Sequence, residues 1–297
     1  KWNCDPFPFL TYRVGQLTAS DAQSGDKLGY AVAVSSFRMV VGAPYDDDDT
    51  NGTAAGTVYI YEWDGQDWQQ VDRLIASDGI AGDYFGYSVA IDGDRIVVGA
   101  INATGDTTTD TGAVYIFDWD GSDWNQTDKL FASNGVASDN FGVSVDVDGL
   151  RVLVGANQTG ALIGSAYLYE WNDVTSQWQV TIITASDRLN NDRYGQSVAM
   201  DGDRILIGAW SDDHMGGLGG DAGAAYLYEW DGSAWNETKF AAADSTPGAY
   251  YGYSVSLSAD RLAIGAPRDS ENGTNAGAVY VYDWDGEHWN ETKLGNS

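Results

Sequence analysis

Clusters of aspartate are the first residues in this sequence that could do chemistry, because Ca²⁺ prefers carboxylate oxygens as ligands. An Asp-Gly-Asp triplet lies inside DYFGYSVAIDGDRIVVGA at residues 83–100, and a denser run lies in DDDDTNG at residues 46–52. Arg95 follows the triplet at once, which leaves too few oxygen ligands to surround an ion. We therefore expect the triplet to be a hairpin turn.

The acidic loops that follow each Gly-Ala pair can be interpreted in two ways, as a solvated acidic face or as a calcium site. Calcium is the only cofactor that the sequence suggests, and none is required. The candidate metal ligands in these loops are Asp46, Asp47, Asp48, Asp212, Asp213 and Asp221.

Residues for catalysis are scarce. His214 and His288 are the only histidines, and Cys4 is the only cysteine. No Ser-His-Asp arrangement and no metal-binding histidine spacing occurs. We expect a protein that is not an enzyme, and keep a glycan-active enzyme with paired carboxylates as the last alternative.

The charge balance limits the partners. Fifteen Lys and Arg stand against 44 Asp and Glu, which gives a net charge of −29. That field repels nucleic acid and anionic membranes, and no apolar run is long enough to span a bilayer. Seven Asn-x-Thr sequons predict an extracellular or cell-surface glycoprotein, with attachment at Asn51, Asn102, Asn125, Asn157, Asn236, Asn272 and Asn290.

An internal repeat decides the fold. An aromatic or Leu residue followed by Gly recurs with its glycine at positions 29, 86, 142, 195 and 252, and a Gly-Ala pair follows each glycine after 13 residues. The copies are 57, 56, 53 and 57 residues apart. Constant spacing inside the unit and variable spacing outside it indicate a rigid hairpin joined by adaptable loops.

Each copy reads as four strands. In the second copy, FGYSVAI and DRIVVGA flank the Asp-Gly turn, and GAVYIFDW and WNQTDKL flank a second turn. No segment has a helical period. Units of four antiparallel strands predict an all-β fold, a β-propeller of four-stranded blades.

These motifs resemble the FG-GAP repeat of integrin α-subunit-like β-propellers, of the secreted microbial or algal type. The resemblance rests on FGYSVAI…GDRIVVGA and on the Gly-Ala-Pro triplets at residues 42–44 and 265–267, and it covers residues 18–294. It implies a ligand-binding face formed by the loops between the second and third strands. The family's calcium loop would fall inside the 13-residue interval, where this sequence has no room for it.

We divide the chain into an N-terminal segment at residues 1–17, with an extra outer strand, and a single propeller domain at residues 18–297. The repeats run from about 18–74, 75–130, 131–183, 184–240 and 241–294. A ring that closes at five blades is the favoured prediction. The alternative is that further blades lie outside these ends.

Two more recurrences predict contacts inside the blades. An arginine begins each second strand and an acid precedes the first Trp of each third strand, so we expect ion pairs between strands at one blade edge. The pairs are Arg38–Glu62, Arg95–Asp118, Arg151–Glu170, Arg204–Glu229 and Arg261–Asp283.

Ten of the twelve tryptophans pair across the turn between the third and fourth strands. We expect them to pack between blades, with sugar stacking as the alternative. An aspartate shortly before the aromatic-Gly pair recurs at positions 26, 83, 139 and 192, and we expect it to accept hydrogen bonds in a turn.

The leading hypothesis is a non-catalytic extracellular recognition or adhesion module that binds a glycan or an extracellular protein through the variable loops. Tyr45, Trp210 and His214 are the candidate ligand contacts. The alternative is a self-assembling structural subunit of a cell-surface sheath or filament, which the extra strand and Cys4 would serve.

Overall fold

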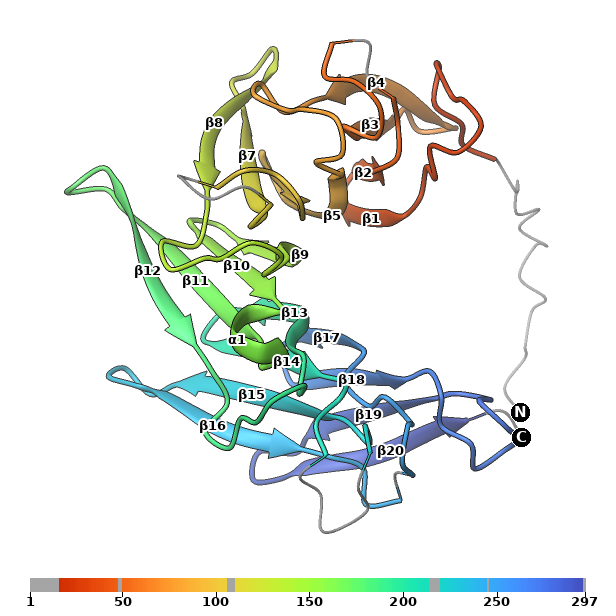
Figure 1. Ribbon diagram of the computed structural model, residues 1–297, viewed down its shortest axis with the longest axis vertical. Helices are drawn as coiled ribbons and strands as arrows, with labels where there is room; N and C mark the ends of the chain where they lie inside the picture. The colour runs from red at the N-terminus through yellow and green to blue at the C-terminus, as the bar shows by residue number, and fades with distance from the viewer. Residues whose placement is uncertain (1–15, 48–49, 106–109, 214–219, 245, 296–297) are drawn as a thin grey trace, which may run out of the picture.

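The computed structural model describes residues 16–47, 50–105, 110–213, 220–244 and 246–295. It contains five sheets of four strands, each with its strands in sequence order, so the prediction of five four-stranded antiparallel blades is confirmed. Blades are numbered here from the N-terminus. Figure 1 shows the first strand of each blade toward the centre and the fourth strand at the rim.

The strands of the first two blades follow the repeat closely. Blade 1 comprises β1 (Ala31–Ser35), β2 (Arg38–Ala43), β3 (Thr57–Trp63) and β4 (Trp68–Leu74). Blade 2 comprises β5 (Phe85–Asp92), β6 (Arg95–Ala100), β7 (Ala113–Trp119) and β8 (Trp124–Leu130).

The remaining blades repeat this order. Blade 3 comprises β9 (Phe141–Asp148), β10 (Arg151–Ala156), β11 (Ser165–Asn172) and β12 (Gln177–Ile183). Blade 4 comprises β13 (Tyr194–Asp201), β14 (Arg204–Ala209), β15 (Ala224–Trp230) and β16 (Trp235–Phe240). Blade 5 comprises β17 (Ser254–Ser258), β18 (Arg261–Ala266), β19 (Ala278–Trp284) and β20 (Trp289–Gly295).

The Asp-Gly-Asp triplet is a hairpin turn, as its sequence predicts. Asp92 pairs with Arg95 across β5 and β6, and Gly93 in the turn has a φ of 55°. A two-residue turn needs this left-handed conformation, which glycine adopts without a steric penalty. One short helix, α1 (Thr159–Leu162), lies in the loop between β10 and β11.

The core lies between blades rather than inside any one of them. Val40, Val58 and Ile60 of blade 1 join Val89 and Ile91 of blade 2 in one buried cluster. Clusters of the same construction join the other neighbouring blades. Because both faces of a blade are covered by its neighbours, its middle strands are continuous apolar runs.

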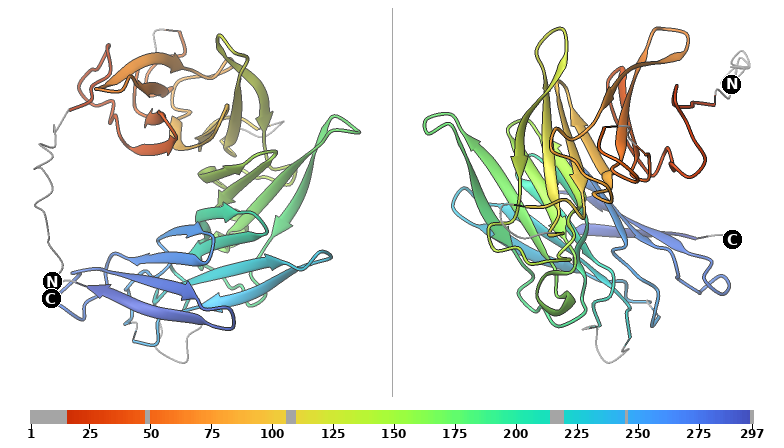
Figure 2. Two further views of the ribbon diagram at one scale, coloured as in Figure 1. Left: turned by 180° about the vertical axis from the view of Figure 1, so that it is seen from behind. Right: turned by 45° about the horizontal axis from the view of Figure 1, so that its top comes forward.

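The five blades form an arc whose two ends are blade 1 and blade 5 (Figures 1 and 2). The first strand of each blade packs on the next along β1, β5, β9, β13 and β17. Within the described residues, blades 1 and 5 share no interface of this kind. The predicted closure of a five-bladed ring is therefore not seen, because the curvature set by the four interfaces leaves the ends apart.

Candidate functional site

The face that carries the loops between the second and third strands bears two aromatic clusters. The first spans blades 1 and 2. Tyr30 lies against Tyr45 and Tyr87 with ring centroids 6.3 and 4.8 Å apart, and Tyr84 lies 5.0 Å from Tyr45. We call this group, Tyr30, Tyr45, Tyr84 and Tyr87, the tyrosine cluster.

The second cluster spans blades 4 and 5. The Trp210 ring lies 4.4 Å from the ring of Tyr250 and 6.3 Å from that of Tyr253. We call Trp210, Tyr250 and Tyr253 the tryptophan cluster. Tyr84 and Tyr250 occupy the same repeat position, as do Tyr87 and Tyr253, so both clusters lie on the same face of the propeller.

Each cluster has a cation over one of its rings. The Lys27 ammonium lies 3.7 Å from the centroid of Tyr45, and the Arg268 guanidinium lies 4.3 Å from that of Tyr250. Arg268 also donates a hydrogen bond of 2.8 Å to the Tyr250 hydroxyl. These contacts hold the rings in place and put positive charge beside them on a strongly acidic protein.

A row of amide side chains runs from the tryptophan cluster into blade 3. Asn140 donates to Asn157 over 3.3 Å, and Asn157 donates to the Gln196 oxygen over 2.6 Å. The same Gln196 oxygen accepts the indole N–H of Trp210 at 3.2 Å. The inner part of this face is therefore aromatic at its two ends and amide-lined between them.

Two of the three predicted ligand contacts, Tyr45 and Trp210, belong to these clusters. Both side chains are half-buried. His214 lies outside the described residues. Sequence reasoning missed the partner rings, which are Tyr30, Tyr84, Tyr87, Tyr250 and Tyr253. The signal that could have found them is the tyrosine beside the Leu-Gly or aromatic-Gly pair in the first, second and fifth copies.

The predicted metal ligands lie apart in different blades and serve other contacts. Asp46 is buried and accepts a hydrogen bond of 2.6 Å from the Tyr59 hydroxyl. Asp212 is buried and accepts hydrogen bonds from Tyr226 and Lys239. Asp47 accepts a backbone N–H, Asp221 accepts from Ser211, and Asp213 is exposed. Asp48 lies outside the described residues. No group of three or more His, Cys, Asp or Glu in the described ranges could hold a metal ion.

A repeated tyrosine anchors the linker between successive blades, a feature that the sequence reasoning missed. The hydroxyls of Tyr59, Tyr115, Tyr167, Tyr226 and Tyr280 bond to Asp21, Asp78, Asn134, Asp187 and Asp244, respectively. Burial alone would raise the pKa of Asp187, but hydrogen bonds from Lys239 and Tyr226 outweigh it and hold the pKa below its usual value. The anchor is structural because its groups satisfy one another.

Four of the five predicted ion pairs form. The distances are 2.9 Å for Arg38–Glu62, 2.8 Å for Arg95–Asp118, 2.9 Å for Arg204–Glu229 and 2.6 Å for Arg261–Asp283. The pair Arg151–Glu170 is wrong. Both residues face each other in register, but Arg151 bonds to Asp148 of its own hairpin instead.

The same arginines also reach the next blade. Arg38 donates to Asp94 over 2.6 Å, and Arg204 donates to Asp260 over 2.9 Å. Arg95 donates to the Gly149 carbonyl over 3.2 Å. The guanidinium groups lie over tryptophan rings of that neighbour, Arg38 over Trp124 and Arg204 over Trp289.

The tryptophan pairs face each other across the outer turn of every blade, with centroids 5.3–5.7 Å apart. Together with the arginines above them, they favour the packing interpretation over sugar stacking. The recurrent aspartates accept backbone N–H groups, as predicted: Asp26 from Gln23, Asp83 from Ile80, Asp139 from Val136 and Asp192 from Leu189.

The sequons differ in their surroundings. Asn125, Asn236, Asn272 and Asn290 are exposed, whereas Asn51 and Asn102 are half-buried. Asn157 is only 7% exposed and its amide nitrogen is bonded to Gln196, which disfavours glycan attachment there. Cys4 lies outside the described residues. Among the residues described, no helix is long and apolar enough to cross a membrane.

Comparison with known families agrees with this architecture. A sequence model of the FG-GAP repeat matches residues 12–61, 68–117, 124–169, 178–228 and 235–282. Each match ends in the third strand of a blade, and the last four begin at the fourth strand of the blade before it. No curated protein matches the chain. Because the five matches cover most of the sequence, the chain belongs to the FG-GAP repeat family.

Proposed function

We propose that this protein is a non-catalytic recognition propeller that binds a glycan on the face bearing the tyrosine and tryptophan clusters. The observation that carries the proposal is the arrangement of that face, with clusters of tilted and edge-to-face aromatic rings at both ends and amides between them. Sugar rings stack on aromatic faces, and their hydroxyls pair with amide groups and charged side chains.

The family supports the coarser part of this proposal, because FG-GAP propellers are often ligand-binding or adhesion modules. The exposed sequons support placement outside the cell or at its surface, where N-linked glycans are added. The charge of −29 favours a neutral or cationic ligand over a polyanion. A protein ligand on the same face is the alternative within this function.

The interior of the aromatic face also argues for binding rather than catalysis. The charged groups nearest the rings, Lys27 and Arg268, are occupied in contacts with Tyr45 and Tyr250. A glycosidase needs two carboxyl groups that flank the scissile bond. In the described part of this face, the buried acids Asp46 and Asp212 are instead bonded to tyrosine hydroxyls.

A glycan array tests the proposal. The wild-type chain should bind a restricted set of glycans, both with and without EDTA. Trp210→Ala and Tyr45→Ala should each weaken that binding about 5- to 30-fold, since a stacking ring contributes about 1–2 kcal/mol. The control is Trp63→Ala, which removes a 44%-exposed tryptophan from the opposite edge of the blade. Absence of binding to every glycan, or equal loss with Trp63→Ala, would refute the glycan assignment.

A further inference from the structure

The four interfaces between neighbouring blades share a construction that depends on two glycines. We call the face of a blade that packs on the next blade its front, and the opposite face its back. A Cβ atom at Gly99 would lie 2.1 Å from the Gly142 carbonyl oxygen, and one at Gly112 would lie 2.1 Å from the Phe141 oxygen. The same holds, at 1.9–2.1 Å, for Gly42, Gly56, Gly155, Gly164, Gly208 and Gly223.

A serine and an arginine complete most of these interfaces. Ser88 donates to the Gly142 carbonyl of the next blade over 2.7 Å, and Ser144 and Ser197 make the equivalent bonds at 3.0 Å. The arginine at the start of the second strand reaches the next hairpin turn, as described for Arg38, Arg95 and Arg204. These polar contacts surround the apolar cluster and fix the position of the incoming first strand.

Blade 5 carries the same front face, but no other blade lies on it in the described part of the chain. Val279 is 41% exposed and Leu294 is 55% exposed, whereas their equivalents in the other four blades are at most 8% exposed. The Arg261 side chain is 67% exposed, against 10–23% for the other four arginines. The Ser254 hydroxyl has no hydrogen-bond partner in the described part of the chain.

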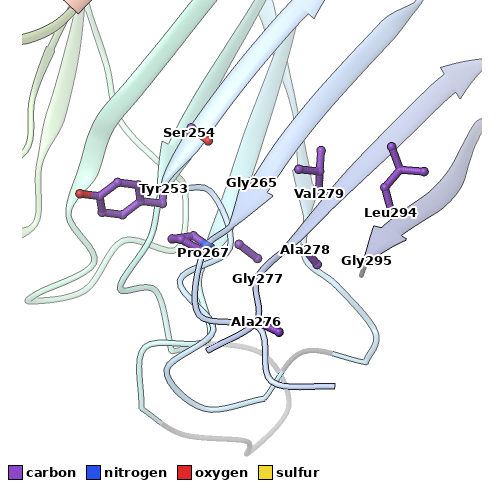
Figure 3. A pocket seen from close by; sticks show the side chains of 11 residues that line it. Tyr253, Ser254, Gly265, Pro267, Ala276, Gly277, Ala278, Val279, Leu294 and Gly295 are labelled. Carbon is purple, nitrogen blue, oxygen red and sulfur yellow. The ribbon is translucent and has the colours of Figure 1, made fainter. Parts of the chain in front are cut away.

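The two glycines of blade 5 are also present, without the backbone that requires them elsewhere. The three atoms nearest to a Cβ atom at Gly265 all belong to Ser254 of the same blade, and a Cβ atom at Gly277 would meet nothing closer than the Pro267 oxygen at 3.3 Å. These glycines line a pocket of about 520 Å³ together with Tyr253, Ser254, Val279 and Leu294 (Figure 3). In the other blades, this place holds the aromatic-Gly segment of the next repeat.

The back of blade 1 carries the complementary half. Val32 and Val34 are 56% and 63% exposed, whereas their equivalents in blades 2 to 4 are buried. Behind them, Ala19 is buried and Asp21 accepts from Tyr59 and Arg73, as Asp78 accepts from Tyr115 and Lys129 in the next blade. Residues 16–21 thus hold the position that the exit segment of a preceding blade holds elsewhere.

We propose that the front of blade 5 is a docking surface for a further repeat of the same family, whose aromatic-Gly segment enters the pocket at Gly265 and Gly277. The first strand of this repeat would cover Val279 and Leu294, and its hairpin turn would accept a hydrogen bond from Arg261. The back of blade 1 would receive the front of such a repeat. The surface continues an interface that the molecule already builds four times.

Two other occupants fit less well. Blade 1 of the same chain lies at the far end of the arc and would need a curvature that none of the four interfaces has. A whole second copy would bring five blades into a gap that is narrower than the arc itself (Figure 1).

Thiol labelling tests this proposal on the full chain in a Cys4→Ser background. Val279→Cys reports on the front of blade 5, and Val180→Cys, at a 46%-exposed position on β12, is the control. Both cysteine variants are labelled in two chains, the 297-residue chain and an extended chain. The extended chain carries a second copy of residues 78–130 after Ser297, which continues the repeat in register. Mass is measured by light scattering.

Val279→Cys should react as fast as Val180→Cys in the 297-residue monomer and at least about tenfold more slowly in the extended chain. Gly277→Ala in the extended chain should restore fast labelling, because its Cβ would exclude the incoming backbone. Slow labelling of Val279→Cys in the 297-residue monomer would mean that blade 1 of the same chain covers the surface. Slow labelling in a dimer would mean that a second copy covers it. Either result overturns the proposal. Fast labelling of Val279→Cys in the extended chain also overturns it, whether or not the added repeat has folded.

Discussion

At the scale of single residues, the arginine that begins each second strand acts in two directions. Arg38 bonds to Glu62 in its own blade and to Asp94 in the next, and it lies over the ring of Trp124. A guanidinium has enough donors in a fixed plane to serve all of these partners, which an ammonium does not. The residue therefore contributes to the sheet and to the blade interface together.

Replacement of Arg38 by Met should cost about 2 kcal/mol of unfolding free energy, because Glu62 and Asp94 lose their partner. Arg261→Met should cost much less, because Arg261 bonds to one exposed acid at the free end of the arc, where solvent screens the pair. Urea unfolding of both variants measures the difference. Equal losses would show that contacts between blades contribute nothing beyond the pair within the sheet.

Asp146 stands where the equivalent strands carry Ala or Ser, and it faces blade 4. Burial raises its pKa to about 6, and hydrogen bonds from the Met200 and Val147 backbones offset only part of that increase. Asp148 and Asp201 raise it further by repulsion. A carboxyl group with a raised pKa stabilises the fold while protonated, and this contribution is lost as pH rises through about 6.

Asp146→Asn should therefore stabilise the protein by about 2 kcal/mol at a pH of about 8 and change little at about pH 4, where both side chains are neutral. The amide oxygen can still accept the Met200 N–H. Thermal unfolding of the variant and the wild type across this range is the measurement. A stabilisation that does not depend on pH would contradict the assignment of the shifted pKa.

At the scale of elements, the fold is built from hairpins joined by close contacts between backbones. Gly112 and Gly277 occupy the same repeat position, and both have a positive φ, 91° and 78°. Only Gly112 has the backbone of the next blade against it. The pair therefore separates the cost of the left-handed conformation from the cost of the contact between blades.

Gly277→Ala should cost about 1 kcal/mol from backbone strain alone. Gly112→Ala should cost more than about 3 kcal/mol, because its Cβ would overlap the Phe141 oxygen as well. Denaturant titration compares the two variants. Similar losses would mean that the blades separate easily enough to accommodate the methyl group.

Much of the element scale could be predicted from the sequence, because a two-residue turn and a fixed 13-residue interval set the hairpin register within one repeat. The register places Arg38 opposite Glu62 and Trp63 opposite Trp68, as expected. It also places Arg151 opposite Glu170, yet Arg151 bonds to Asp148. The strand register determines which residues lie opposite each other, but it does not determine which of the nearby acids forms the ion pair with the arginine.

Contacts between blades could not be predicted in the same way. Tyr45 was predicted as a ligand contact from its loop position, but its neighbour Tyr84 belongs to the next repeat and lies close only after the blades pack. The extension of Arg38 to Asp94 depends on the same packing. The periodicity of one repeat contains no information about the rotation between repeats, so these pairs emerge only in the structure.

At the scale of the whole molecule, the arc brings aromatic and amide side chains from different repeats together on one face. The tyrosine cluster lies at blades 1 and 2 and the tryptophan cluster at blades 4 and 5, and Asn140, Asn157 and Gln196 extend from the tryptophan cluster into blade 3 between them. Divergence at these positions, against near identity in the strands, is how a repeat scaffold acquires a binding site. Recognition by this face is the central claim.

Hydroxyl-radical footprinting of the chain with a glycan selected on the array tests that claim most directly, since it reports on individual aromatic side chains. Tyr45, Tyr250 and Trp210 should be oxidised several-fold more slowly when the glycan is bound, while the outer tryptophans Trp63 and Trp230, 44% and 39% exposed, should be unchanged. Protection of Trp63 and Trp230, with the two clusters still fully reactive, would contradict it.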